Sequence, residues 1–183
     1  MRWVLLTFLL TSLCFCGLRR AVEATDTHAE AFWRFVPGEQ SRSLEHLEPV
    51  FKEKALQILR DLEREGYTVS IDATWRSPLR QEMLYIYSGL RSWVGLGEAT
   101  QRKLQGSCHT RVSPNKEPAA LALDIRLSEE TSLKEHAAFF HRLGELARHH
   151  DLRWGGNWAR RNATWRPFNL GWDPGHVESL RCR

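Results

Sequence analysis

The 183-residue chain is poor in cysteine, has no long apolar run beyond Leu18, and carries no large excess of charge of either sign. Only two of its four cysteines, Cys108 and Cys182, lie outside the apolar N-terminal stretch. This argues against a structural zinc site, which usually takes four ligands that include thiolates. Without residues 1–24, the basic residues fall from 26 to 23 and the acidic ones from 22 to 21, which leaves a net charge of +2. Nothing therefore indicates a nucleic-acid partner.

Internal repeats and a domain-splitting linker are also lacking, so the length fits one domain, expected to span 25–183. Residues 1–24 have the features of a secretory signal peptide, with Arg2 before an apolar run and small residues at the cleavage position after Ala24. The Arg19-Arg20 pair leaves an uncleaved anchor open. We expect a secreted or periplasmic protein that contacts a membrane only through an uncleaved leader. In such an oxidising compartment, the two remaining cysteines favour one disulfide.

The spacing of apolar residues predicts a mixture of helices and strands. Four signals mark the first helices, with Pro49 and Pro78 suited to first turns, Gly66 to a stop and Ser77 to an N-cap. The expected helices are 48–65, from Pro78 to about Tyr87, and 133–150, with a further short one within 98–104. The expected strands are 67–75, 121–126, an extended segment from Asp151 to Trp154, and 176–180.

The segment 121–126 alternates, which places Asp124 on the face opposite its apolar residues, beside the small Ala122. The same period places His176 and Glu178 on one face of the last strand. Asp173 stands three residues before His176 on a Pro-Gly bend, where a carboxylate can serve as general base beside a metal-binding imidazole. The strands thus carry polar side chains of the types that bind metals.

His109, Asp124 and His176 are the candidate ligands. Two nitrogens and one oxygen, with a fourth position left for water, are typical of catalytic zinc. Zinc lowers the pKa of its water to about 7, and Asp173 is placed to take the proton. Arg76, where a strand turns into a helix, can stabilise an oxyanion or orient a substrate carboxylate, and Glu178 can hydrogen-bond a ligand imidazole.

Each of these residues also has an ordinary interpretation. The chain has eight histidines, most of which must be surface or core residues, and Asp-Pro-Gly is a common turn. Asp124 alone fits a strand-end cap, Arg76 alone fits a surface ion pair, and the tryptophans from Trp154 to Trp172 fit core packing. His141 and Glu145, four apart on a helix, are more often solvated than metal-bound.

Taken in order, the motifs resemble those of zinc peptidoglycan peptidases, the VanY-like family of D-Ala-D-Ala carboxypeptidases and L-alanyl-D-glutamate endopeptidases. The resemblance covers about 48–180. It is carried by Trp75-Arg76-Ser77-Pro78 with Gln81 and Tyr85, Ser107-x-His109, Ala122-x-Asp124, Trp154-Gly155-Gly156-Asn157-Trp158, and Asp173-x-x-His176-x-Glu178.

The resemblance implies an α+β fold, in which helices flank a small antiparallel sheet with one zinc-binding groove. It implies Zn²⁺ on His109, Asp124 and His176, with Asp173 as base and Arg76 on the substrate side. We expect substrate contacts from Gln81, Ser107, Trp154 and Trp172. The implied substrate is peptidoglycan or its stem peptides.

Two features depart from the family pattern. The family has seven residues from the histidine to the aspartate, whereas His109 and Asp124 are 15 apart, so 110–118 must loop out and change the rim of the groove. Cys108 beside a ligand is expected to pair with Cys182, or to contact metal in a reduced protein.

The Trp-Gly-Gly-Asn-Trp stretch favours the endopeptidase branch, so we expect hydrolysis of an L-alanyl-D-glutamate-type bond. A D-Ala-D-Ala carboxypeptidase with the same zinc chemistry is the first alternative, with Arg76, Arg111 or Arg153 to bind the free carboxylate. A non-catalytic cell-wall-binding module is the second.

Overall fold

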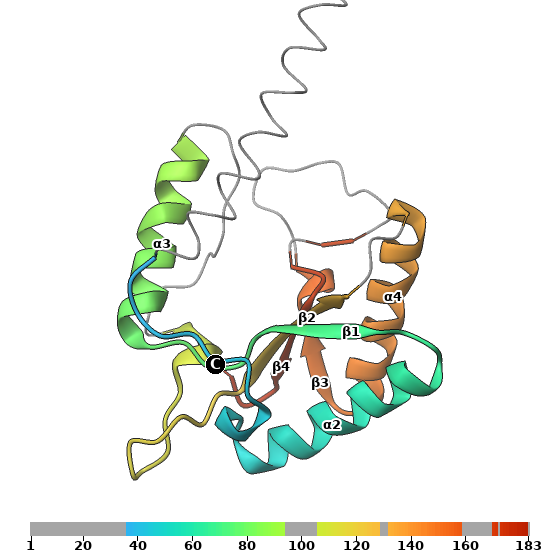
Figure 1. Ribbon diagram of the computed structural model, residues 1–183, viewed down its shortest axis with the longest axis horizontal. Coiled ribbons are helices and arrows are strands. Elements are labelled where there is room, and N and C mark those ends of the chain that lie inside the picture. The colour runs from blue at the N-terminus through green and yellow to red at the C-terminus, as the bar shows by residue number, and fades with distance from the viewer. Residues whose placement is uncertain (1–35, 94–105, 129–131, 159–169, 172, 183) are drawn as a thin grey trace, which may run out of the picture. The chain divides into compact units, whose positions relative to one another are not determined.

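A computed structural model describes residues 36–93, 106–128, 132–158, 170–171 and 173–182, and the fold is formed from Gly38 onward. Its centre is a sheet of four strands, in which every neighbouring pair is antiparallel (Figure 1). The strands are β1 (Val69–Ala73), β2 (Ala122–Leu127), β3 (Leu152–Trp154) and β4 (His176–Ser179), in the spatial order β1-β2-β4-β3. With its helices, this is the expected α+β fold.

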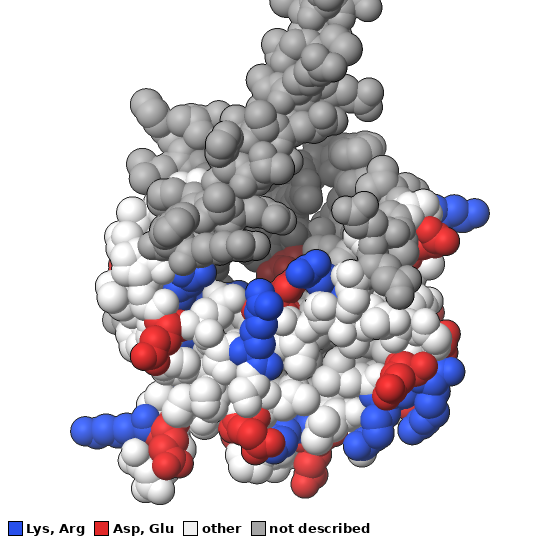
Figure 2. Space-filling model, in the orientation of Figure 1, with Lys and Arg blue, Asp and Glu red and all other residues white. Residues whose placement is uncertain are grey.

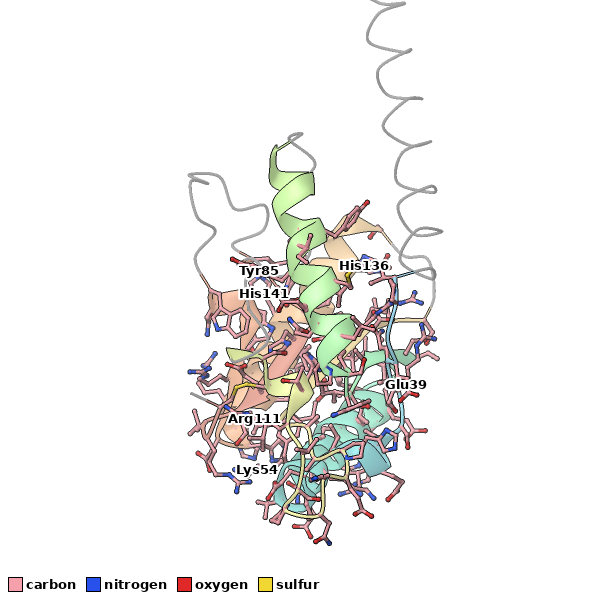
Figure 3. The ribbon with its side chains drawn as sticks, turned by 90° about the vertical axis from the view of Figure 1, so that its left-hand side faces the viewer. Glu39, Lys54, Tyr85, Arg111, His136 and His141 are labelled. Carbon is pink, nitrogen blue, oxygen red and sulfur yellow. A yellow bond between two sulfur atoms is a disulfide. The ribbon has the colours of Figure 1, made fainter. Side chains whose placement is uncertain are left out.

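Three α-helices accompany the sheet, α2 (Pro49–Arg64), α3 (Pro78–Trp93) and α4 (Leu133–His149). In Figure 1, α2 and α4 lie together next to the sheet, whereas α3 stands apart from them. Figure 3 shows α3 from the side, in front of the sheet and above α2. No helix within the described ranges has the length and apolar character needed to cross a membrane.

The helix ends follow the signals in the sequence. Pro49 opens α2, and Gly66 follows its end with a φ of 88°, a conformation that glycine adopts without strain. The Ser77 hydroxyl accepts a hydrogen bond from the backbone N–H of Arg80 at 3.2 Å, as an N-cap does. Helix α3 runs on to Trp93 rather than ending near Tyr87, because one interior glycine costs a helix only about 1 kcal/mol. The short helix expected within 98–104 lies outside the described residues.

The two faces of the sheet differ sharply. On one face, apolar side chains of β2, β3 and β4 pack against α2 and α4 to form the main core. The core residues from the strands are Leu123, Ile125, Leu127, Leu152, Trp154 and Val177, and those from α2 are Phe51, Ala55, Ile58 and Leu62. The alternate residues of the same strands point to the other face, which carries the polar side chains that the sequence singled out.

Strand register sets which polar residues meet. Asp124 lies directly opposite His176, and Ala122 lies opposite Glu178. On the other side of β4, Arg153 also lies opposite Glu178. The register of β2, β3 and β4 thus brings polar residues that are far apart in the sequence next to one another on one face of the sheet.

Candidate metal centre

His109 lies on a 3-10 turn, Cys108–Thr110, and its side chain is buried. Its Nδ1 donates to the carbonyl oxygen of Thr74 at 2.6 Å, so Nε2 carries the lone pair. Within the described part of the chain, this buried Nε2 makes no hydrogen bond of acceptable geometry, although Asp124 Oδ2 lies 3.3 Å from it. Burial and the positive charge of Arg76 lower the pKa of His109, which keeps the ring neutral. A buried, neutral nitrogen without a partner is suited to a metal.

Asp124 supplies the oxygen beside it. Its Oδ2 lies 3.3 Å from His109 Nε2 and accepts from Arg76 Nη2 at 2.5 Å, while Oδ1 lies 2.7 Å from His176 Nδ1. Although burial acts in the opposite direction, the positive charge of Arg76 and the hydrogen bond from His176 hold the pKa of Asp124 well below its usual range. The carboxylate is therefore ionised and central to the group.

His176 completes the set from β4. Its Nδ1 faces Asp124, and its Nε2 lies 3.3 Å from Glu178 Oε2. Burial lowers the pKa of His176, but the hydrogen bonds to Asp124 and Glu178 outweigh it and raise the pKa to about 10. A metal at Nδ1 would take the place of that proton, with Nε2–H still donated to Glu178.

His109, Asp124 and His176 each offer one ligand atom, and these atoms all lie within 4.8 Å of one another. The donor set of two imidazole nitrogens and one carboxylate oxygen fits zinc with an open position. The unpartnered Nε2 of His109 points to the same conclusion from the protein side. The residues present thus fit the metal that the sequence predicted.

Two charged side chains border this group. Asp173 Oδ2 lies 4.0 Å from His176 Nδ1, and Asp173 is partly buried. Burial, aided by the negative charges of Asp124 and Glu178 and opposed by His176 and Arg76, raises the pKa of Asp173 to about 6. Arg76 reaches Asp124 from the junction of β1 and α3, and its backbone N–H donates to the carbonyl of His109 at 3.0 Å. The 74–76 segment is therefore tied to the His109 turn in both directions.

The bend that carries Asp173 is held by the Trp-Gly-Gly stretch. Trp154 Nε1 donates to the carbonyl of Pro174 at 2.7 Å. A side chain at Gly155 would meet the carbonyl oxygen of Asp173 at 2.2 Å, so the two backbones approach as only glycine allows. Trp154 is itself buried in the core rather than open to the cavity. Its contribution to the site is to position the bend.

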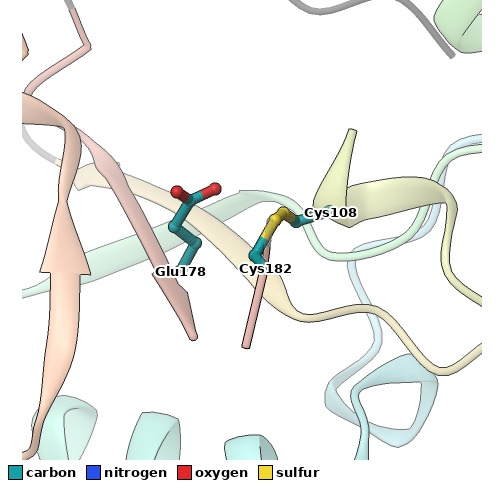
Figure 4. A group of neighbouring side chains, drawn as sticks. All are labelled: Cys108, Glu178 and Cys182. Atoms are coloured by element: carbon teal, nitrogen blue, oxygen red, sulfur yellow. A yellow bond between two sulfur atoms is a disulfide. The ribbon is translucent and has the colours of Figure 1, made fainter. Parts of the chain in front are cut away.

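A disulfide joins Cys108 to Cys182, as the sequence predicted, with the Cα atoms 5.9 Å apart. It links the residue before His109 to the segment just after β4. Figure 4 shows the disulfide beside the carboxylate of Glu178. The disulfide thus joins covalently the two segments that carry His109 and His176.

The group opens into a cavity of about 320 Å³. Trp158 forms part of its wall, with its ring centroid 5.0 Å from that of His176. The described residues that line the cavity include every proposed ligand, both proposed catalytic residues, Ser107 and Glu178, together with Asp72, Arg126, Phe140 and Pro174.

Figure 2 shows acidic and basic side chains interspersed on the visible face, without a large area of one sign.

Among the lining residues that were not predicted as site residues are Asp72, Arg126 and Phe140. Asp72 and Arg126 form an ion pair at 2.8 Å beyond Asp124, and the alternation of β2 was a signal for Arg126. Phe140 gave no such signal, because its spacing on α4 is that of a core residue. Gln81, expected to contact substrate, is 1% exposed and is not among the lining residues, and Trp172 lies outside the described residues.

The inserted segment 110–118 does loop out, but away from the described cavity. Val112 and Pro118 form a bridge, and the N–H of Ser113 donates to the carbonyl of Glu117 at 2.8 Å. None of its residues is among those that line the cavity. In the described part of the groove, the insertion therefore does not form the rim.

No family model and no curated protein matches this sequence. Solved structures do match. VanYB in complex with D-alanine-D-alanine is 14% identical, with a TM-score of 0.47, over 79% of this chain and 77% of that one. A variant of the vancomycin resistance D,D-pentapeptidase VanY in complex with Zn(II) is 13% identical, with a TM-score of 0.46, over 79% of each chain. The LdcB LD-carboxypeptidase is 16% identical, with a TM-score of 0.42, over 73% of this chain and 59% of that one. Peptidases of the type that the motifs predicted are thus among the solved structures that this chain resembles.

Proposed function

We propose that this protein is a zinc-dependent peptidase that hydrolyses a peptide bond in the stem of peptidoglycan. The observation that carries the proposal is the convergence of His109, Asp124 and His176 at one end of a cavity, with Asp173 and Arg76 beside them. Five residues from four separate segments meet there, and the buried Nε2 of His109 makes no hydrogen bond among the described residues. Buried polar atoms are usually hydrogen-bonded, so a neutral ring nitrogen that faces a carboxylate oxygen at 3.3 Å without a hydrogen bond supports a bound cation at this place.

Zinc held by these three residues would polarise the scissile carbonyl and lower the pKa of a water in the open position. Asp173, which lines the cavity 4.0 Å from His176, would accept the proton of the attacking water on Oδ2 and deliver it to the leaving amine. Arg76 keeps Asp124 ionised and presents a permanent positive charge to the substrate oxygen.

The endopeptidase branch is the finer part of the proposal, with an L-alanyl-D-glutamate-type bond as the target. A carboxypeptidase must hold a free C-terminal carboxylate with a cation. Of the three arginines considered for this role, only Arg76 lines the cavity, and its Nη2 is bonded to Asp124. Arg126, which also lines the cavity, is paired with Asp72. Arg153 is paired with Glu178 instead. The motif order from Trp154 to Trp158 supports the same branch.

The decisive experiment is digestion of purified muropeptides by the zinc-loaded protein, with the new termini identified by mass spectrometry. Cleavage between L-alanine and D-glutamate is expected, and it should slow by about 10²- to 10⁴-fold with Asp173→Asn, which keeps the shape of the side chain. Release of free D-alanine alone would instead establish the carboxypeptidase alternative. Zinc binding without any cleavage would favour a cell-wall-binding module. A substrate of this kind lies outside the cytoplasm, which fits the secretory signal peptide that the sequence predicts for residues 1–24.

A further inference from the structure

The ion pair between Arg153 and Glu178 lies directly behind the metal group. Pairing of β3 with β4 sets the two residues opposite one another, and Arg153 Nη2 donates to Glu178 Oε1. The Glu178 side chain is 2% exposed, whereas that of Arg153 is 36% exposed. The guanidinium therefore reaches from the surface strand inward to a buried carboxylate.

Glu178 in turn holds the ring of His176. Its other oxygen, Oε2, lies 3.3 Å from His176 Nε2, and the opposite ring nitrogen, Nδ1, faces Asp124. A carboxylate that accepts from the outer nitrogen of a ligand imidazole fixes both the tautomer and the orientation of that ring. The three side chains thus form a chain of contacts, from Arg153 through Glu178 to His176.

The Glu178 carboxylate is buried, so the charged hydrogen bond from Arg153 contributes to stabilising it. Ala122, opposite Glu178 on β2, is fully buried, and the sulfur atoms of Cys108 and Cys182 lie within 4.8 Å of a Glu178 oxygen (Figure 4). These apolar neighbours give a buried carboxylate no compensation for the water that it has lost. A charged hydrogen bond from Arg153 supplies compensation and fixes the plane of the carboxylate.

We propose that Arg153 is a positioning residue for the metal centre, which acts through Glu178 to hold His176 with Nδ1 toward His109 and Asp124. The inference rests on the proposed function, since it takes these residues to hold zinc. Arg153 is not among the described residues that line the cavity, so its effect does not pass through a substrate contact there.

The test is Arg153→Met, which keeps much of the aliphatic stem and removes the guanidinium. Its dissociation constant for zinc, measured by competition with a chelator, is expected to rise about 10- to 100-fold, as for other outer partners of metal ligands. The matched control is Arg142→Met. Arg142 also bonds a glutamate, Glu65, and is 37% exposed, but it lies away from the cavity. This control should bind zinc as the wild type does.

Coupling separates positioning from a general loss of stability. In a Glu178→Gln background, Arg153→Met should add almost no further weakening, because its route to His176 is already cut. Arg153→Lys, which keeps the charge, should fall between wild type and Arg153→Met, and it carries the test if the methionine variant does not fold. Unchanged affinity in these variants, or effects that simply add, would overturn the inference alone. A wild type that binds no zinc would overturn the proposed function and this inference with it.

Discussion

The two faces of the sheet are built from the same strands and do different things. Along β4, Val177 points into the core and is 1% exposed, while His176 and Glu178 on either side point to the metal group. Along β2, Leu123 and Ile125 enter the core, and Asp124 between them is the central member of the candidate ligand group. Residues that pack in the core and residues of the candidate site thus alternate along the same two strands.

This alternation explains how a small domain keeps charged groups in fixed places. The packed face holds the strands by burial, at about 25 cal/mol for each Å² of apolar surface removed from water. The opposite face then needs little apolar contact of its own. Its charged groups are instead compensated by one another, as in the contacts of Asp124 with Arg76 and His176. Substitutions that respect this division should affect one property and leave the other intact.

The sharpest test compares alanine substitutions at two adjacent residues of β4 that point to opposite faces of the sheet. His176→Ala should abolish stoichiometric zinc and lower activity on the order of a thousandfold or more, since the metal contributes several kcal/mol to transition-state stabilisation. Val177→Ala should instead lower the free energy of unfolding by about 2 kcal/mol and keep full zinc content. Metal analysis and urea unfolding on both variants decide the comparison. Retained zinc in His176→Ala would mean that the ligand is wrongly assigned.

Within the polar face, binding and proton transfer should also separate. Asp173→Asn is expected to lower kcat by about 10²- to 10⁴-fold, the usual contribution of a general base, because an amide cannot accept the proton. Its zinc content should stay stoichiometric, since Asp173 lies outside the three-residue ligand group. Steady-state kinetics on a cleaved muropeptide provide the measurement. Wild-type kcat in this variant would remove Asp173 from the mechanism.

Sequence periodicity was sufficient to predict which way Asp124, His176 and Glu178 point on their strands, but not which residues support them. Alternation predicts that Asp124 and Glu178 point away from the core, because it depends only on local geometry. The contact of Arg153 with Glu178 depends on the register between β3 and β4, which no local pattern sets.

Trp154 shows the same limit from the packed side. Its indole lies against Gly144 and Gly156, where any side chain would collide with the ring. That space comes from a glycine on a distant helix as well as from the neighbouring loop. Trp154, which was expected to contact substrate, is therefore a core residue, and only the tertiary packing reveals this.

Removing the disulfide tests whether this cross-link stabilises the polar face in addition to the packing of the core. The double variant Cys108→Ser/Cys182→Ser releases a cross-link between residues 74 apart, which is expected to lower the free energy of unfolding by about 4 kcal/mol. Urea unfolding without reductant gives the value, and reduced wild type should resemble the variant. At saturating zinc, the folded variant should still bind metal, because neither cysteine belongs to the ligand group. A loss below about 1 kcal/mol would show that packing alone holds this face.

The smallest effect is expected where a charge supports the packed face from outside the site. The Glu48 carboxylate caps α2 through the N–H of Phe51 at 2.9 Å and accepts from Arg181 at 2.7 Å. Although partial burial opposes it, these contacts lower the pKa of Glu48 from 4.5. Glu48→Ala should therefore cost about 1 kcal/mol of stability at neutral pH, with zinc affinity unchanged.

The pH dependence of that loss identifies its cause. A carboxyl with a lowered folded pKa stabilises the protein fully above its unfolded value of 4.5, and this stabilisation is lost as the pH falls through the folded value. The difference in unfolding free energy between wild type and Glu48→Ala should thus shrink in acid below pH 4.5. Glu53→Ala, an exposed position on the same helix, should stay within about 0.5 kcal/mol of wild type throughout. A Glu48 difference that persists unchanged at low pH would assign the effect to the side chain's shape instead of its charge.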